Sequence, residues 1–530
     1  MSNINETSAT EWLNYNEGDK KINSTLYMEA VLQYDREFNK KHQVGGLFVY
    51  TMKNSLNANS GSLQKSLPYR NMGLAGRLTY GYDNRYFIEG NFGYNGSERF
   101  SKNHRFGFFP SAGLGWMISN ESFFSPLSKY ISQMKFKVTY GLVGNDAIGD
   151  ASDRFFYLSE VNMNSGNSPG FGVNFNSPAA RPMVSVNRYA NPNITWEIAR
   201  KLDVGLEATL FNDFTFQIDY FTEYRKNILM NRSAITPEMG LEASVRANVG
   251  EARGAGFDAS LDYNKYFQNG LVLTGRANFT YATSQFEVYE EPVYSDAPWR
   301  SRVGKSLSQN WGYIAERLFV DEEDVNNSPT QFGEYGAGDI KYRDVNRDGI
   351  INENDKVPIG HPTSPEIIYG FGLSASYKHF DLSCFFQGSG RSSFWIDQQA
   401  TAPFVDTDGD GNVISNNALL SVYANNHWSE KNQNIYALWP RLSNYIVENN
   451  NQTSTWFMRD GSFLRLKQLE VGYTFPDFIK KAYLTSLRFY LSGTNLLTFS
   501  KFKLWDPEMA GNGFGYPVQR TFNIGVQMNF

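Results

Sequence analysis

Phe522-Asn-Ile-Gly-Val-Gln-Met-Asn-Phe530 ends the chain with strict alternation of apolar and polar or small residues. The apolar side chains stand at positions 522, 524, 526, 528 and 530, so they share one face of a β-strand. Asn, Gly and Gln occupy the other face, and the last residue is itself aromatic. This pattern is typical of the closing strand of a bacterial outer-membrane barrel, whose outer face meets lipid.

The composition is compatible with such a barrel. The 530 residues have a mean hydropathy of −0.46, and no segment approaches the ~18 consecutive apolar residues of a membrane-spanning helix. Aromatic residues make up 16%, and 46 residues are Gly. Aromatic girdles at two membrane interfaces explain this excess, whereas a soluble β-sandwich or propeller is the alternative that composition leaves open. The net charge of −5 indicates no nucleic-acid partner, and the single Cys384 excludes an intramolecular disulfide or a Cys-based zinc site.

Alternating segments recur along the chain and predict about fifteen or sixteen strands, most near the ~10 residues that cross a bilayer when tilted. Besides the last one they are 26–38, 43–52, 73–82, 85–94, 107–118, 134–143, 202–211, 214–224, 245–263, 271–286, 369–377, 380–386, 463–475 and 487–497.

The connections between these segments alternate in length. Short ones fall at 39–41, 83–84, 212–213, 264–270 and 378–379, and long ones include 144–194, 394–455 and 498–518. Outer-membrane barrels have this asymmetry, with the long loops outside the cell. The alternation fails at 287–365, where the pattern permits either a hidden strand or one large external loop containing residues 311–319.

We therefore predict an all-β fold, a transmembrane antiparallel β-barrel that spans residues 1–530 with long extracellular loops. Large plugged transporters have about 22 strands, so the barrel is expected to be partial, with about six strands and the plug missing on the N-terminal side. Closure matters because an open sheet edge in hydrocarbon costs several kcal/mol for each unpaired backbone group. Met1-Ser-Asn-Ile-Asn-Glu6 has no features of a secretory signal, so we expect the chain to be part of a longer protein.

Local motifs sharpen this prediction. They are Arg77-Leu-Thr-Tyr-Gly-Tyr-Asp-Asn-Arg-Tyr86, Phe109-Pro-Ser-Ala-Gly-Leu-Gly-Trp116, Tyr140-Gly-Leu-Val-Gly-Asn145, Thr195-Trp-Glu197, Leu202-Asp-Val-Gly-Leu206, Asn248-Val-Gly-Glu251, Gly338-Asp-Ile-Lys-Tyr-Arg-Asp-Val-Asn-Arg-Asp-Gly-Ile350, Phe380-Asp-Leu-Ser-Cys-Phe-Phe-Gln-Gly388, Asn495-Leu-Leu-Thr498 and Asp506-Pro-Glu508. In order and spacing they resemble the C-terminal barrel half of the SusC/RagA-like TonB-linked outer-membrane transporters (TonB-dependent receptors) of Bacteroidetes.

The resemblance implies nutrient import across the outer membrane rather than catalysis. Members of that family pair with a SusD-like surface lipoprotein, take up oligosaccharides or peptides, and are energised by the TonB–ExbB–ExbD system through the plug. Two other functions stay open at this point. One is a passive or remnant outer-membrane barrel without energised transport, and the other is a soluble carbohydrate-binding β-protein.

One segment has the spacing of a calcium loop. Asp344-Val-Asn-Arg-Asp-Gly-Ile-Ile-Asn-Glu-Asn-Asp355 places oxygen ligands at positions 1, 3 and 5 of twelve, namely Asp344, Asn346 and Asp348. The carbonyl of Ile350 and the carboxylate of Asp355 complete the pattern, although Glu is usual at the last position. The alternative is an Asx-rich turn that satisfies its own backbone. No cofactor is required, and calcium is the candidate ligand.

A weaker calcium candidate has Asp406, Asp408 and Asp410 at the same three positions but lacks a closing carboxylate. Aromatic residues in the expected external loops could stack on sugar rings, or could simply pack within the loops or against the SusD-like partner. They are Trp428, Tyr436, Trp439, Trp505, Phe514 and Tyr516.

Catalytic motifs do not emerge from the sequence. Val303-Gly-Lys-Ser306 resembles a phosphate-binding loop, but position 299 is Trp where the first Gly of that motif belongs. The five His residues have no metal-ligand spacing, and Cys384 has no His nearby in sequence. We therefore predict that the protein is not an enzyme.

Overall fold

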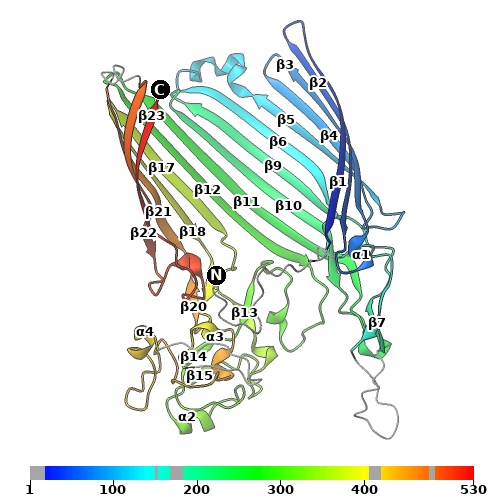
Figure 1. Ribbon diagram of the computed structural model, residues 1–530, viewed down its shortest axis with the longest axis vertical. Helices are drawn as coiled ribbons and strands as arrows, with labels where there is room; N and C mark the ends of the chain where they lie inside the picture. The colour runs from blue at the N-terminus through cyan, green and yellow to red at the C-terminus, as the bar shows by residue number, and fades with distance from the viewer. Residues whose placement is uncertain (1–17, 19, 150–152, 167–182, 405–418, 477–483) are drawn as a thin grey trace, which may run out of the picture.

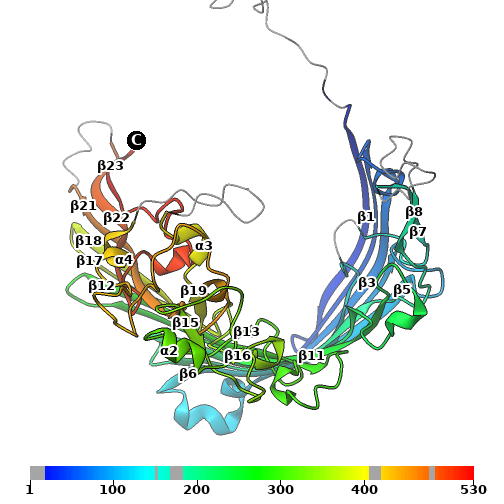
Figure 2. The ribbon, with the colours of Figure 1, turned by 90° about the horizontal axis from the view of Figure 1, so that it is seen from below.

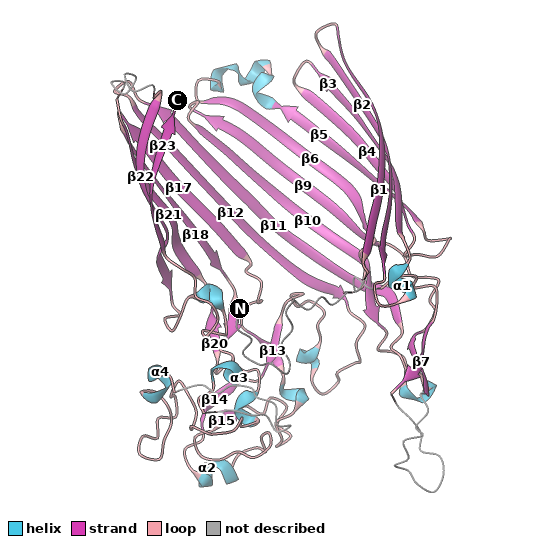
Figure 3. Ribbon diagram, viewed as in Figure 1, coloured by secondary structure: helices cyan, strands magenta, loops and turns pink. Residues whose placement is uncertain are grey.

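The computed structural model of the chain describes residues 18, 20–149, 153–166, 183–404, 419–476 and 484–530. Fifteen strands form one antiparallel sheet in which each strand pairs with the next strand of the sheet along the chain. We call this sheet the wall (Figures 1 and 3). The number of strands and their simple meander order confirm the prediction made from the alternating segments.

The wall contains β1 (Ile22–Phe38), β2 (His42–Ala58), β3 (Tyr69–Tyr82), β4 (Tyr86–Ser97), β5 (Phe106–Met117), β6 (Ile131–Asn145), β9 (Glu197–Leu210), β10 (Phe214–Asn231), β11 (Arg246–Tyr266), β12 (Leu271–Val288), β17 (Ile367–Tyr377), β18 (Phe380–Gly390), β21 (Phe463–Thr474), β22 (Ser486–Ser500) and β23 (Thr521–Asn529). They range from 9 residues in β23 to 21 in β11. Several are longer than predicted. A tilted strand needs only about 9–11 residues to cross a bilayer, so the additional residues extend beyond it.

One end of the wall carries short turns and the other carries long loops, as Figure 1 shows. In the tight turns two successive residues have positive φ, namely Asn39 and Lys40 after β1 and Asp83 and Asn84 after β3. Turns with two successive positive φ angles match the twist of the strands that they connect. The predicted alternation of short and long connections is therefore present in the structure.

The wall curves into an open trough rather than a closed barrel. Figure 2 shows β1 and β23 on opposite arms of the curve, far from each other. Among the described residues, neither of these edge strands pairs with a second strand. This geometry agrees with the expectation of a partial barrel.

Three long loops pack together at one end of the trough, and we call their described residues within 289–366, 391–462 and 501–520 the cap. In Figure 2 the cap lies on the concave side, next to the C-terminal strands of the wall. The connection between β12 and β17, residues 289–366, adds no strand to the wall, so the single long loop is the alternative that the structure supports, and β12 itself extends to Val288. The cap contains β13 (Asn310–Gly312), β14 (Ala315–Leu318), β15 (Ile340–Tyr342), β16 (Val357–Ile359), β19 (Ser393–Trp395), β20 (Met458–Asp460), α2 (Glu322–Asn326), α3 (Gln398–Thr401), α4 (Ser421–Ala424), η4 (Pro298–Arg300), η5 (Glu353–Asp355), η6 (Asn449–Asn451) and η8 (Pro507–Met509).

The remaining elements are short. They are α1 (Leu63–Ser66), η1 (Ile118–Asn120), η2 (Ser122–Leu127), β7 (Glu160–Ser165), β8 (Met183–Arg188) and η3 (Pro237–Met239). None of the helices in the described part of the chain is both long and apolar enough to cross a membrane.

Candidate functional site

The outer, convex face of the wall is apolar. Leu78 on β3 is 71% exposed, Ile88 on β4 is 53% exposed and Leu114 on β5 is 59% exposed, and Ile88 and Leu114 are register partners. Register keeps such side chains on one face of the sheet across neighbouring strands. A row of exposed aliphatic side chains of this size suits contact with lipid chains.

The inner, concave face is polar and charged. Arg77 on β3 contacts Glu89 on β4 at 2.7 Å. Lys137 on β6 lies 3.1 Å from Glu207 on β9 and 2.9 Å from Asp219 on β10. Residues of this kind line a wide hollow over strands β1 to β6. The inner face therefore presents hydrogen-bonding groups that water and polar solutes can contact.

The same inner face continues to the C-terminal strands. Arg488 on β22 contacts Asp381 on β18 at 2.5 Å and Glu470 on β21 at 2.6 Å. One guanidinium thus connects three neighbouring strands. Both arms of the trough are polar inside, so the wall can enclose an aqueous space once it is closed.

The cap has a hydrophobic core of its own. Its buried members are Tyr313, Leu318, Ile340, Tyr342, Ile351, Phe394, Ile396, Ala402, Tyr423, Trp428, Ala437, Trp439, Phe457 and Phe502. They come from all three cap loops, so the loops fold as one unit. This core rigidifies a surface over the loop end of the trough.

A buried carboxylate joins two of the cap loops. Asp339 is fully buried and accepts hydrogen bonds from Arg441 Nε and Asn450 Nδ2, each at 2.8 Å. Burial raises the pKa of the Asp339 carboxyl despite these partners. Removing either partner would leave a buried charge uncompensated, so the contact fixes how the loops meet.

A second carboxylate organises the cap near α2. Asp324 accepts hydrogen bonds from Arg317 Nη2 at 2.8 Å and from Lys341 Nζ at 3.0 Å. The Arg317 guanidinium holds the pKa of Asp324 well below its usual range. Asp324 is therefore ionised wherever the cap is folded at ordinary pH.

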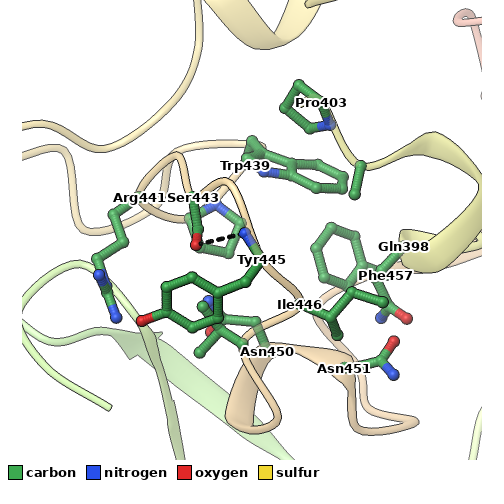
Figure 4. Close-up of a pocket in the computed structure, with 13 residues that line it drawn as sticks. Gln398, Pro403, Trp439, Arg441, Ser443, Tyr445, Ile446, Asn450, Asn451 and Phe457 are labelled. Atoms are coloured by element: carbon green, nitrogen blue, oxygen red, sulfur yellow. Dashed lines mark hydrogen bonds between the residues drawn. The ribbon is translucent and has the colours of Figure 1, made fainter. Parts of the chain in front are cut away.

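The cap contains a small pocket, drawn in Figure 4. Aromatic side chains of Trp439, Tyr445 and Phe457 line it together with Arg441, and amide, aliphatic, Pro and Ser residues complete the lining. Trp439 and Phe457 lie with ring centroids 5.3 Å apart. Both belong to the cap core, so this pocket is a small cavity left where the cap loops pack together.

The cap is also tied to the wall. Arg465, on the inner face of β21, is 1% exposed and contacts Asp506 at 2.5 Å and Glu508 at 2.9 Å. These acids lie in the loop between β22 and β23 and belong to the motif Asp506-Pro-Glu508. The ion pairs hold that loop against the wall at the loop end of the trough.

The predicted calcium loop uses its carboxylates internally. Asp344 accepts the backbone N–H of Arg347 at 2.6 Å and of Gly349 at 2.8 Å. Asp348 accepts the backbone N–H of Ile350 at 2.9 Å, which lowers the pKa of its carboxyl. These contacts are those of an Asx-rich turn.

The end of the same loop is buried. Asp355 accepts the backbone N–H of Val345 at 2.7 Å and of Asn352 at 2.9 Å, and Asn346 donates to Asp348 at 2.8 Å. In the part of the chain that the structure describes, no group of three or more His, Cys, Asp or Glu is placed to hold a metal ion. Calcium binding by Asp344, Asn346, Asp348, Ile350 and Asp355 stays a prediction.

The weaker calcium candidate, Asp406, Asp408 and Asp410, lies outside the described residues. The loop aromatics divide into two groups. Trp428 and Trp439 are buried in the cap core, and Trp505 packs against it. Tyr436, Phe514 and Tyr516 are exposed and free to meet a partner or solute.

Sequence reasoning did not single out Asp339, Arg441 or Arg465. Asp339 directly follows Gly338 in the longest family-like motif, and Arg465 lies in a predicted strand. The available signals were the position of Asp339 inside that motif and the presence of a charged residue, Arg465, in a largely apolar strand. Their partners lie about 100 residues away for Asp339 and 41 residues away for Arg465, so pairing could not be inferred.

The family model "TonB dependent receptor-like, beta-barrel" matches residues 3–358. TonB-dependent receptor P3 of Formosa agariphila is 27% identical over 482 residues, covering 86% of this chain and 45% of that protein. TonB-dependent receptor SusC of Bacteroides thetaiotaomicron is 26% identical over 472 residues, covering 86% of this chain and 43% of SusC.

Solved structures show the same fold. The RagAB peptide transporter has a chain that matches with a TM-score of 0.70 at 21% identity, covering 96% of this chain and 56% of that one. The RagAB peptide importer in its closed-closed state matches with a TM-score of 0.69 at 20% identity. The chain spans about half the length of the curated relatives it matches.

Proposed function

The chain belongs to the TonB-dependent receptor β-barrel family of the outer membrane, and we propose that it forms the wall and outer cap of a nutrient importer. The imported solutes are oligosaccharides or peptides too large for diffusion through porins. A SusD-like surface lipoprotein covers the cap end, and TonB–ExbB–ExbD supplies energy through a plug outside this chain. Similarity to SusC and to the RagAB peptide importer supports this assignment.

The two-faced wall carries the proposal. Its outer side chains are apolar and its inner side chains include ion-paired charged groups, as an aqueous passage through lipid requires. The folded cap at the loop end adds a defined surface where a solute or a lipoprotein can be held. A soluble carbohydrate-binding protein would not expose an apolar face of this extent to water.

Growth of the source bacterium tests the proposal. We expect deletion of the complete gene to abolish growth on one class of oligosaccharide or peptide, and the wild-type gene to restore it. Restoration should fail in a strain that lacks TonB, because uptake through a plugged barrel needs energy. Uptake that persists without TonB would instead establish a passive barrel.

A matched pair of variants connects the growth test to the wall. Arg488→Met removes the inner-face cation that joins Asp381 and Glu470, whereas Leu491→Met changes a lipid-facing side chain three residues along the same strand. We expect the first to alter uptake and the second to leave it unchanged. Both proteins must reach the outer membrane in equal amounts for the comparison to count.

A further inference from the structure

The connection between β5 and β6 forms a separate protrusion at the short-turn end of the wall. It contains η1 and η2, and we call residues 118–130 the foot. In Figure 2 the foot projects from the convex side of the wall, below the base of the curve. It therefore stands on the side of the wall that faces lipid, at the level of the short turns (Figure 1).

The foot is amphipathic. Phe123 is 62% exposed, and Leu127 and Tyr130 are about half exposed. Small polar residues fill most other positions, and Lys129 lies 5.8 Å from the Tyr130 ring. A short segment with bulky apolar side chains, serines and one basic residue matches the chemistry of the bilayer interface.

The foot is continuous with aromatic side chains at the short-turn end of the wall. Trp116 at the end of β5 packs edge to face with Phe123, with ring centroids 6.4 Å apart. Tyr130 packs in the same way with Phe211, with ring centroids 6.1 Å apart. Trp116 and Phe211 are themselves exposed. Aromatic residues gather at this level of outer-membrane barrels, where one end of the ring is wet and the other is in hydrocarbon.

One carboxylate fixes the foot to the wall. Glu121 accepts hydrogen bonds from Trp116 Nε1 at 3.1 Å, from Arg85 Nη1 at 3.3 Å and from the Tyr86 hydroxyl. Asn120 Nδ2 donates to the carbonyl of Asn84 at 2.8 Å. The foot is thus held in one orientation by the wall and by its buried Phe124, while the described residues of the chain leave Phe123, Leu127 and Tyr130 exposed.

We propose that the foot is a membrane-interface anchor that inserts Phe123 and Leu127 into the leaflet at the short-turn end. Short turns lie on the periplasmic side of outer-membrane barrels, so the occupant is the phospholipid of the periplasmic leaflet. Lys129 reaches back toward headgroup phosphates. This inference rests on the outer-membrane location and not on the identity of the imported solute.

Site-directed spin labelling tests the anchor in the full-length protein, reconstituted in vesicles of phosphatidylethanolamine and phosphatidylglycerol. The background has every cysteine of the full-length protein replaced by Ser, including Cys384→Ser, and labels are attached at Phe123→Cys, at Leu127→Cys and, as an aqueous control on the same rim, at Lys40→Cys. We expect the ratio of oxygen to nickel-chelate accessibility to be several-fold higher at 123 and 127 than at 40. Heat-modifiable migration on gels confirms that each barrel is folded.

Two outcomes would overturn the proposal. Nickel accessibility at 123 and 127 equal to that at 40 would place the foot in water. Protection from both reagents would show that protein, not lipid, covers it. Glu121→Ala adds a check on the attachment, because the label at 123 should become more mobile while the barrel stays folded.

Discussion

The wall and the cap place their large apolar side chains differently: the wall exposes them on its outer face, and the cap buries them in a core. In the wall, Ile524 is 85% exposed on the outer face, and the charged side chains point into the trough. In the cap, Leu318 and Phe457 are fully buried in the shared hydrophobic core. The difference shows that one chain is folded against two solvents, with lipid standing in for a protein core around the wall.

The largest effect is expected in the cap core. Phe457→Ala should destabilise the cap by about 3–5 kcal/mol, because the cavity left beside Trp439 has no solvent to fill it. Leu491→Ala on the outer face of β22 should cost much less in a bilayer, because lipid chains occupy the vacated space. Hydrogen exchange of cap amides measures the first, and unfolding in vesicles measures the second. Equal losses would show that the wall has a core of its own.

Introducing a charge on the outer or the inner face of the wall tests whether the outer face contacts lipid and the inner face contacts water. Leu373→Lys on the outer face should cost about 2–4 kcal/mol at the bilayer midplane. Ser374→Lys, one residue along β17, points inward beside Thr274 and Ser383 and should cost little. Denaturant unfolding of the two proteins in vesicles separates them. If both cost the same, the face assignment is wrong.

Acid should loosen the cap before it affects the wall's lipid contacts. The lowered pKa of Asp324 means that its ion pairs stabilise the cap fully above the ordinary carboxyl value of 3.8 and are lost as pH falls below it. Asp339, whose pKa is raised, acts in the opposite sense.

Asp324→Asn isolates the first of these two contributions. We expect it to cost roughly 1.5–3 kcal/mol at neutral pH, because a charge-assisted contact with Arg317 is weakened. The difference from wild type should shrink as pH falls below 3.8. Proteolysis of the cap at several pH values measures this, and a difference that does not change with pH would contradict it.

Alternation was sufficient to predict the wall from sequence. Each strand has a lipid face and a water face, so its pattern is written in consecutive residues such as Ile524, Gly525 and Val526. Turn residues such as Asp83-Asn84 located the hairpins. Strand ends were less well predicted, because residues beyond the bilayer on β10, β11 and β12 no longer need an apolar face.

The cap could not be predicted in the same way. Its core joins residues from loops that are far apart in sequence, for example Leu318 with Trp439 and Phe502, and its strands have only three or four residues. No periodic pattern is needed for such short pieces to pack. The long-range pair of Asp339 and Arg441 leaves no local signal either.

The calcium loop is where the comparison predicts the smallest effect. At a dissociation constant on the order of 10⁻³ M, about 10 mM calcium would stabilise the cap by only about 1.4 kcal/mol. The expected result is a small rise in the melting temperature of the cap with calcium and none with magnesium, since Mg²⁺ demands a tighter octahedron.

Asp348→Asn is the variant that separates binding from folding. It keeps an oxygen that accepts the backbone N–H of Ile350 but removes the charge that a cation would need. If calcium binds, the variant should have the wild-type melting temperature without calcium and no longer respond to it. If wild type does not respond either, the carboxylates of Asp344 and Asp355 serve only the backbone donors they already contact. The loop would then be stabilised only by contacts within the cap, whereas the outer face of the wall is stabilised by contact with lipid.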